Sequence, residues 1–367
     1  MSSTTAEPTF RIAGLLRVFR AQEMGLVAVA LILCIGLSIA GEYSPSRYGN
    51  AFLNFDNLFN GVATPMSIFA IMAVGMTFVI ITGGIDISIA SIFAVSALGT
   101  AWLLQSIWPL TRGDAQPSAL WVLPVAILVP PLIGLMCGLV NGILVVSLRM
   151  HPFIVTLATL GIFRGLAVVT LSPQTTLPSG ANNLPHAFTQ NFMTYEFAPG
   201  LRLMPMIIML IVVTMGWIYL RLTVAGRENY AIGGNEEASR YSGLRVGRIK
   251  LRVYALAGLC AGIAAMVHLG RFGSASTNTL TGGELSVIAA AVVGGASLTG
   301  GRGTALGAIL GALVIRLIEN GIDILRLNQE YSRIIIGVAI LLAVSIDQVS
   351  SLLRNRQQLG GAGRRGA

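Results

Sequence analysis

The sequence predicts an all-α integral membrane protein that crosses the bilayer about ten times. Of its 367 residues, 54% are hydrophobic and only 11% are charged, whereas a soluble domain carries about 25% charged residues. The mean hydropathy is +0.77. Apolar windows of roughly 20 residues recur along the chain, and each is long enough to cross the hydrocarbon core.

Ten windows fit a membrane span, and a polar segment lies at each end of the chain. Residues 1–23 and 351–367 are predicted to be cytoplasmic tails around a single transmembrane domain, 24–350, with no cleaved signal. The fourth span contains three prolines and is expected to kink. The eighth is short and ends in glycines, which is typical of a broken or re-entrant helix. The predicted spans are 24–41, 61–82, 87–108, 119–148, 153–172, 204–222, 251–269, 284–298, 304–322 and 332–349.

The distribution of basic residues predicts the orientation. With the N-terminus inside, the inside segments hold 16 arginines and lysines and the outside loops hold 5. Cytoplasmic loops retain Lys and Arg, so both termini are expected inside, with a long loop at about 173–203 outside. The basic residues are dispersed through short loops beside the membrane lipid. The net charge of +9 therefore does not indicate nucleic-acid binding.

The inside loop at about 223–250 is predicted to contain a helix of about two turns. Asn235 can cap this helix, and Glu236 and Glu237 lie in its first turn, where the helix dipole favours anions. Arg240 lies near its last turn, and Gly243 ends it. On the local pattern alone, a solvated connector and a docking element both remain open.

Four long blocks resemble permease subunits of the ribose/xylose/arabinose-type family of bacterial ABC importers. They run in the family's order between about 61 and 348. The blocks are GGIDISIAS, VNGILVVSLRMHPFIVTLATLGIFRGLA, GRENYAIGGNEEASRYSGLRVGRIKLRVYALAGLCAG and GGELSVIAAAVVGGASLTGGRGTALGAILGALV. One stretch departs from the family: many members have E-L-D-A-I-A where this chain has Glu284-Leu285-Ser286-Val287.

The resemblance implies a ten-helix permease for a monosaccharide or related small polar solute in the bacterial inner (plasma) membrane. It implies a second permease copy or paralogue, two ATP-binding domains on the cytoplasmic side and an extracytoplasmic solute-binding protein. ATP and Mg would bind in the partner ATPase, with no cofactor or metal in this chain. The short cytoplasmic helix would sit in a cleft of the ATPase. The implied coupling residues are Gly233, Gly234, Asn235, Glu236, Glu237, Ala238, Ser239, Arg240, Ser242 and Gly243.

The chain carries no motif for hydrolysing ATP itself. A phosphate-binding loop needs G-x-x-x-x-G-K-[ST], and the sole lysine, Lys250, lies outside any such pattern. The glycine-rich segment 294–304 has no lysine and is expected to form close helix packing or a tight turn. Since no acid/base or metal constellation is present either, the energy must come from another chain or from an ion gradient.

Polar side chains within the spans are candidates for the solute path, because such groups tend to face the bundle interior. Asp86 is expected at or next to the N-cap of the third span, with solute or ion contact as the alternative. Arg164 is expected to form a structural ion pair, with snorkelling toward the outer face or solute contact as the alternatives. Thr156 and Thr159 share a helical face, so a pathway role and helix–helix hydrogen bonding are both open. The candidates are Asp86, Ser88, Asn141, Thr156, Thr159, Arg164, Glu284, Ser286 and Asn320.

Two other functions remain open from the sequence. An ion-coupled secondary transporter would use intramembrane carboxylates such as Asp86, Glu284 or Asp323. An ABC permease could instead carry an amino acid or a furanone-like signal molecule. The sequence identifies neither the solute nor whether the partner permease is identical.

Overall fold

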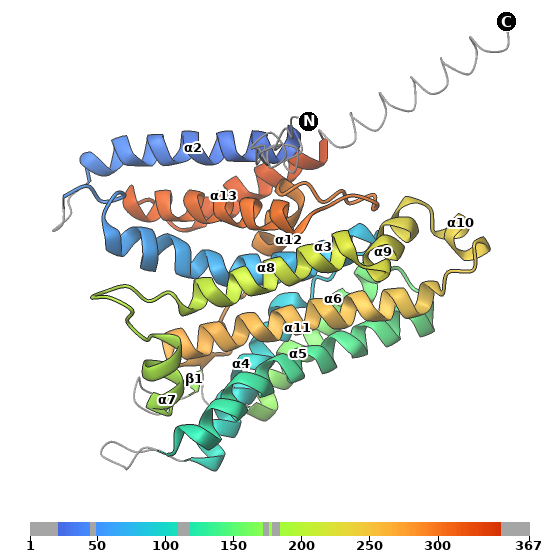
Figure 1. The fold of residues 1–367 in the computed structure, drawn as a ribbon, viewed down its shortest axis with the longest axis horizontal. Helices are drawn as coiled ribbons and strands as arrows, with labels where there is room; N and C mark the ends of the chain where they lie inside the picture. The colour runs from blue at the N-terminus through green and yellow to red at the C-terminus, as the bar shows by residue number, and fades with distance from the viewer. Residues whose placement is uncertain (1–20, 45–48, 109–116, 172–175, 178–183, 346–367) are drawn as a thin grey trace, which may run out of the picture.

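The computed structural model describes residues 21–44, 49–108, 117–171, 176–177 and 184–345, and these are mostly helical (Figure 1). By length and composition, eight described helices can cross a membrane, and Gly283–Val293 is a shorter apolar helix. The predicted all-α membrane fold is therefore confirmed. The helices are α2 (Ala21–Glu42), α3 (Thr64–Ile81), α4 (Ile89–Ile107), α5 (Ala119–Leu148), α6 (Pro152–Leu166), α7 (His186–Phe188), α8 (Met204–Leu222), α9 (Val224–Gly234), α10 (Glu236–Tyr241), α11 (Val246–Phe272), α12 (Gly283–Val293) and α13 (Ala305–Ile324), with π-helical stretches η1 (Asn57–Ala63), η2 (Ala167–Leu171) and η3 (Thr189–Met193).

Most predicted spans match these helices, and α5 and α8 coincide with the predicted 119–148 and 204–222. The helix α5 is continuous through its three prolines. Residues 330–345 are also helical, while the rest of the predicted span 332–349 and most of both tails lie outside the described residues. So do residues 173–175 and 178–183 of the loop 173–203. The described part of this loop includes β1 (Thr176–Leu177), paired antiparallel with β2 (Ala275–Ser276).

Two helix boundaries, in α11 and α12, differ from the prediction by five residues each. The helix α11 begins at Val246, about one turn before the predicted 251. The first turns of α11 contain charged residues, which lower the mean hydropathy there and made the predicted start too late. In the structure one of them, Lys250, forms an ion pair with Glu236. The helix α12 ends at Val293 rather than 298. Its 11 residues span roughly 16 Å, about half of the hydrocarbon core, so α12 alone does not cross the membrane.

The helices α5 and α11 pack side by side through glycine (Figure 1). Gly134 and Gly138 on α5 face Gly258 and Gly262 on α11, each pair spaced four residues apart. A Cβ atom on Gly258 would overlap the carbonyl oxygen of Gly134. Small residues at this spacing let helix backbones approach closely in a membrane. The backbone of α11 is thereby held against α5, while α11 also packs on α3 and α4.

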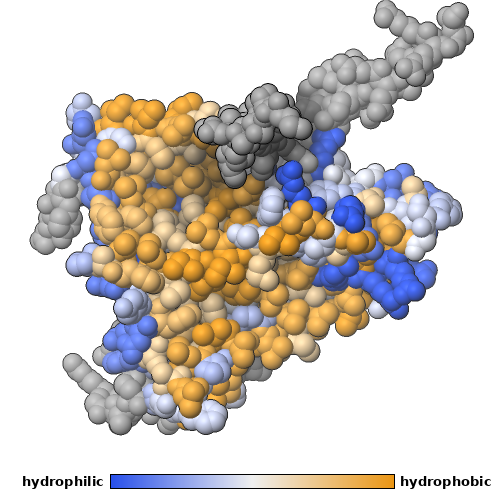
Figure 2. All heavy atoms as spheres, in the orientation of Figure 1, coloured by the Kyte–Doolittle hydropathy of each residue, from blue (hydrophilic) through white to orange (hydrophobic). Residues whose placement is uncertain are grey.

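The interior of the bundle is α3 with α11, while several outer helices expose apolar faces. Each span contains an 18-residue apolar window, and in the span that contains α3 83% of this window is buried. The buried share is 28% for α5, α6 and α8 and 17% for α2. Exposed apolar side chains include Ile32, Leu128 and Met215. Hydrophobic residues cover much of the visible surface (Figure 2). A surface of this kind is expected for helices that face lipid acyl chains.

Several helix ends meet at the end of the bundle from which α10 projects (Figure 1). The Thr304 hydroxyl, at the start of α13, donates to Glu23 Oε1 near the start of α2 (2.8 Å). The Gly301 N–H donates to the Ile81 carbonyl at the end of α3 (2.8 Å), and the Tyr230 hydroxyl on α9 donates to the Gly303 carbonyl (2.7 Å). The segment 294–304 thus forms a tight turn, as predicted, which joins α2, α3, α9 and α13.

The glycine contact between α5 and α11 can be tested by substitution. Gly258→Ala places a methyl group against the Gly134 backbone, which cannot give way as a side chain can. We expect destabilisation of roughly 1–3 kcal/mol, measured as thermal unfolding of the detergent-purified protein. Gly161→Ala on α6 is the matched control, because a Cβ there meets nothing within 4 Å. Equal stability of the two variants would contradict the proposed packing.

Candidate functional site

The turn between α3 and α4 carries a fully buried carboxylate. Asp86 Oδ1 accepts from the Ser88 N–H (3.0 Å) and from the Ser88 hydroxyl (2.6 Å). From α5, Asn141 Nδ2 donates to Ser88 Oγ (2.7 Å) and to Asp86 Oδ2 (3.2 Å). All three residues are completely buried. This network holds the turn against α5.

A second polar contact holds the same turn from α6. The Thr156 hydroxyl accepts from the Ile87 N–H and donates to the Ile85 carbonyl, each at 3.2 Å. Thr159 Oγ1 contacts the Thr156 carbonyl of its own helix (3.3 Å). Five of the predicted pathway residues therefore gather in and around one buried turn: Asp86, Ser88, Asn141, Thr156 and Thr159.

The structure changes the predicted capping role of Asp86. The carboxylate accepts a backbone N–H as expected, but α4 begins at Ile89 with Ser88 as its cap residue, two residues later than predicted. Asp86 closes a turn before the helix and is shared with α5. Burial raises the pKa of the Asp86 carboxyl, and the hydrogen bonds from Ser88 and Asn141 oppose that shift. Its main contacts are thus with protein groups that position the turn.

A polar cavity of about 410 Å³ lies beside the turn, a size typical of small-molecule sites. The buried Tyr254 hydroxyl has no hydrogen-bond partner within the described chain, and it lies at the cavity wall next to Gly84. The cavity also reaches the start of α10. Its lining includes Gly83, Gly84, Asn235, Glu236, Lys250 and Tyr254.

The structure does not bring the remaining pathway candidates to this turn. The Arg164 guanidinium donates to the backbone carbonyls of Thr277 (2.8 Å) and Thr279 (3.2 Å). No ion pair of Arg164 is present in the described chain, so the predicted structural ion pair is wrong. Carbonyls of the segment between α11 and α12 accept from Arg164 where a carboxylate was expected.

Two further candidates lie on α12 and α13. Ser286 is buried on α12. Asn320 exchanges two amide hydrogen bonds with Asn57, at 2.8 and 3.1 Å. That amide pair joins α13 to η1, so Asn320 holds two helices together. Among the described residues, no group of three or more His, Cys, Asp or Glu side chains is placed to hold a metal ion.

The predicted short helix in the inside loop is present as α10, Glu236–Tyr241. Asn235 Oδ1 accepts from the Ala238 N–H (2.8 Å), and Gly243 has a φ of +84° just after the helix. Both features were predicted. Glu236 also binds Arg240 (3.2 Å) and Lys250 (2.7 Å). These contacts fix α10 to the start of α11.

The helix α9 was not predicted, and it changes the role of the glycine pair. Thr223 caps it by accepting from the Gly226 N–H (3.0 Å), a capping signal that was available in the sequence. Gly233 and Gly234, which the resemblance assigns to coupling, are the last two residues of this helix. A Cβ atom on Gly233 would overlap the Ile81 carbonyl oxygen, whereas one on Gly234 meets nothing within 4 Å. The backbone of α9 therefore rests directly on the end of α3.

A bundle of apolar spans with a polar cavity at one end, beside a projecting short helix, defines a multi-pass membrane protein. Comparison with known proteins gives its family. The family described as "Branched-chain amino acid transport system / permease component" matches residues 58–344, and the chain belongs to this family. No solved structure matches the chain.

Curated relatives align over most of their length. The ribose import permease protein RbsC of Escherichia coli K12 is 36% identical over 330 residues, covering 89% of this chain and 93% of that protein. RbsC of Bacillus subtilis 168 is 37% identical over 300 residues, covering 82% and 86%. The galactose/methyl galactoside import permease protein MglC of E. coli K12 is 34% identical over 341 residues, covering 89% and 94%.

The buried turn gives a prediction for Asp86. Asp86→Asn keeps an oxygen that can accept from the Ser88 N–H, and the unpaired Oδ1 of Asn141 can turn to accept from the new amide. We expect normal assembly and stability, measured by membrane yield, gel filtration and thermal unfolding. Asp86→Leu leaves buried donors unsatisfied and should cost about 1–3 kcal/mol. An Asp86→Asn protein that assembles normally but does not transport would show that the path needs the carboxylate itself.

Proposed function

We propose that this chain is the transmembrane permease subunit of a binding-protein-dependent ABC importer for a monosaccharide or related small polar solute. One observation carries the proposal: relatives that align over nearly the whole chain are named as permeases for ribose and for galactose and methyl galactoside, and another is named for D-allose. ATP and Mg²⁺ would bind in separate subunits, which supply the energy.

The proposed coupling route starts at α10. Two ATP-binding domains would receive this helix on the cytoplasmic side, where both termini would also lie. Motion would pass from α10 to α9, and then through the backbone contact of Gly233 to Ile81 and Gly301. Ile81 ends α3, and the turn with Asp86 follows directly. Closure of the ATPases would thereby shift the turn that borders the polar cavity.

The other partners would bind elsewhere on the permease. A solute-binding protein would dock at the opposite end, where the described part of the loop 173–203 lies (Figure 1). A second copy or a paralogue would complete the path in the bacterial inner membrane. Specificity would then be set largely by the binding protein, so the path itself needs only weakly polar groups.

The cavity lining favours a neutral solute. Glu236 and Lys250, the lining residues of opposite charge, bind each other at 2.7 Å. Besides His151, the remaining polar lining offers hydroxyl, amide and backbone groups to the solute. A polyol can use such groups as donors and acceptors. A second cargo, an amino acid, is suggested by the family's description. Its ammonium and carboxylate would need charged partners, which favours the sugar.

Reconstitution tests the proposed function. The permease, with an ABC ATPase and a sugar-binding protein encoded beside it, should take up a monosaccharide into proteoliposomes only when ATP is supplied on the ATPase side. Uptake of branched-chain amino acids is measured in parallel. Uptake by the permease alone, driven by an ion gradient, would instead establish a secondary transporter and disprove the proposal.

Gly233 and Gly234 provide a matched pair for the coupling route. Gly233→Ala should separate α9 from the end of α3 and reduce ATP-driven uptake by at least about tenfold, because something in the backbone must shift. Gly234→Ala should leave uptake near the wild-type rate. ATPase copurification is measured for both, since we expect α10 to keep binding its partner. Equal uptake by the two variants would rule out this route.

A further inference from the structure

A second groove, which shares Glu236 and Lys250 with the polar cavity, lies where α5 reaches the end of its membrane span. Its volume is about 650 Å³, and it is bounded by the end of α5, by α10 and by the first turn of α11. Figure 2 shows hydrophilic residues gathered around this end of the bundle. Its charged lining comprises Arg149, Arg240, Arg245, Arg248 and Lys250, with Glu236 as the one carboxylate. Five cations and one anion leave the groove with a net charge of +4.

Three of these arginines have no partner among the described residues. Glu236 binds both Arg240 and Lys250, so no carboxylate in the groove remains for the others. The three unpaired, exposed arginines are Arg149, Arg245 and Arg248. A guanidinium offers a planar fork of donors that fits phosphate oxygens. The groove is therefore suited to a phosphate-bearing anion.

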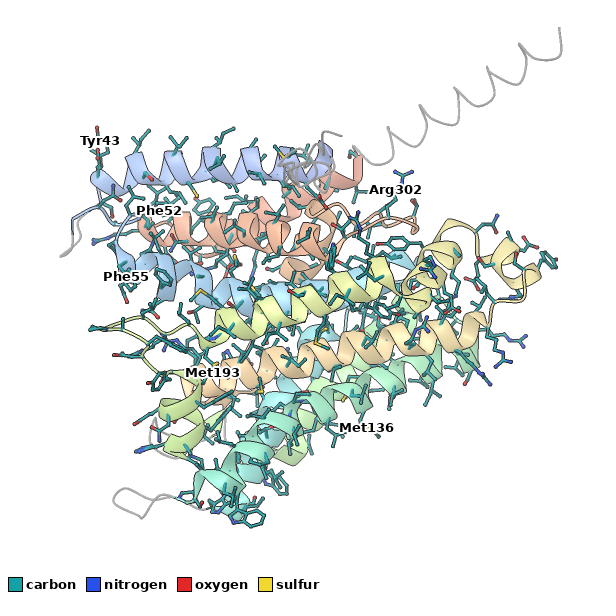
Figure 3. All side chains as sticks on the ribbon, in the orientation of Figure 1. Tyr43, Phe52, Phe55, Met136, Met193 and Arg302 are labelled. Carbon is teal, nitrogen blue, oxygen red and sulfur yellow. The ribbon has the colours of Figure 1, made fainter. Side chains whose placement is uncertain are left out.

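An apolar stripe leads along α5 toward the same groove. Met136, Val140 and Ile143 lie on one helix face and are 55%, 42% and 52% exposed. Figure 3 shows Met136 pointing away from the bundle. The exposed stripe from Met136 to Ile143 is about 10 Å long, and it ends one turn before Val146, which packs toward Gly247 of α11 at the edge of the groove.

We propose that the groove binds an anionic phospholipid, with its phosphate held by the three unpaired arginines and an acyl chain lying along the stripe. Basic pockets between membrane helices recognise such headgroups. An acidic surface of a soluble subunit would also meet the arginines, but it would leave the stripe uncovered. The stripe that leads to the groove is the reason for choosing a lipid.

The test compares two double variants of the full chain. Arg149→Gln/Arg248→Gln removes two charges from the groove. Arg221→Gln/Arg227→Gln removes two exposed charges outside it, near the ends of α8 and α9. Each protein is placed in nanodiscs with equal phosphatidylglycerol and phosphatidylethanolamine, and retained lipid is measured by native mass spectrometry. We expect phosphatidylglycerol enrichment to fall on the order of tenfold in the groove variant and to stay at the wild-type value in the control.

Several outcomes would overturn the proposal. Equal enrichment in all three proteins would mean that the groove holds no lipid, and equal loss in both variants would indicate only bulk surface charge. Displacement of the lipid by millimolar inorganic phosphate would indicate a free-anion site. Unchanged enrichment with lost ATPase copurification would assign the groove to the ATPase. Gel filtration checks folding, and Arg245→Gln, a single change at an exposed side chain, replaces the double variant if that one does not assemble.

Discussion

Direct contact between helix backbones, made possible by glycine, is the constraint on which this structure depends. In a bilayer the hydrophobic effect does not drive one helix onto another, so close packing has to provide the attraction. The α5–α11 contact at Gly138 and Gly258 does this in the middle of the bundle. The same device recurs between α12 and α13, where Gly294 faces Gly307, and between α9 and α3 at Gly233. Each contact fixes a helix pair at a distance that any larger residue would increase.

That close approach also makes the buried polar turn possible. Because α11 lies against α5, Tyr254 on α11 meets Gly84 of the turn, while Asn141 on α5 meets Asp86 and Ser88. A carboxylate buried this far from water is tolerated only when donors surround it. The packing of apolar helices and the pairing of polar groups therefore depend on each other. Loosening the glycine contact would weaken the hydrogen bonds of the turn as well.

Local signals predicted the fold well, whereas the site depends on contacts between distant residues. Span positions follow from apolar length, and α10 follows from the capping residue Asn235, because both are properties of consecutive residues. Arg164 was assigned a carboxylate, but its acceptors are carbonyls 113 and 115 residues away, which no spacing rule supplies. Asp86 and Asn141 were both candidates, but they lie 55 residues apart in the sequence. Their hydrogen bond could be recognised only once the structure placed α5 against the turn. The helix α9 could have been predicted from its capping residue Thr223, but it was not.

Glu236 links the two polar regions of this end of the molecule. It lines both the cavity and the basic groove, and it binds Arg240 of its own helix and Lys250 of α11. By pairing with Lys250 it leaves the cavity close to neutral, as a path for an uncharged solute requires. The arginines that it does not pair remain on the groove side, at the end of the α5 span. One carboxylate thus lies between the cavity and a cationic surface, and both regions meet at the helix proposed to transmit motion from the ATPase.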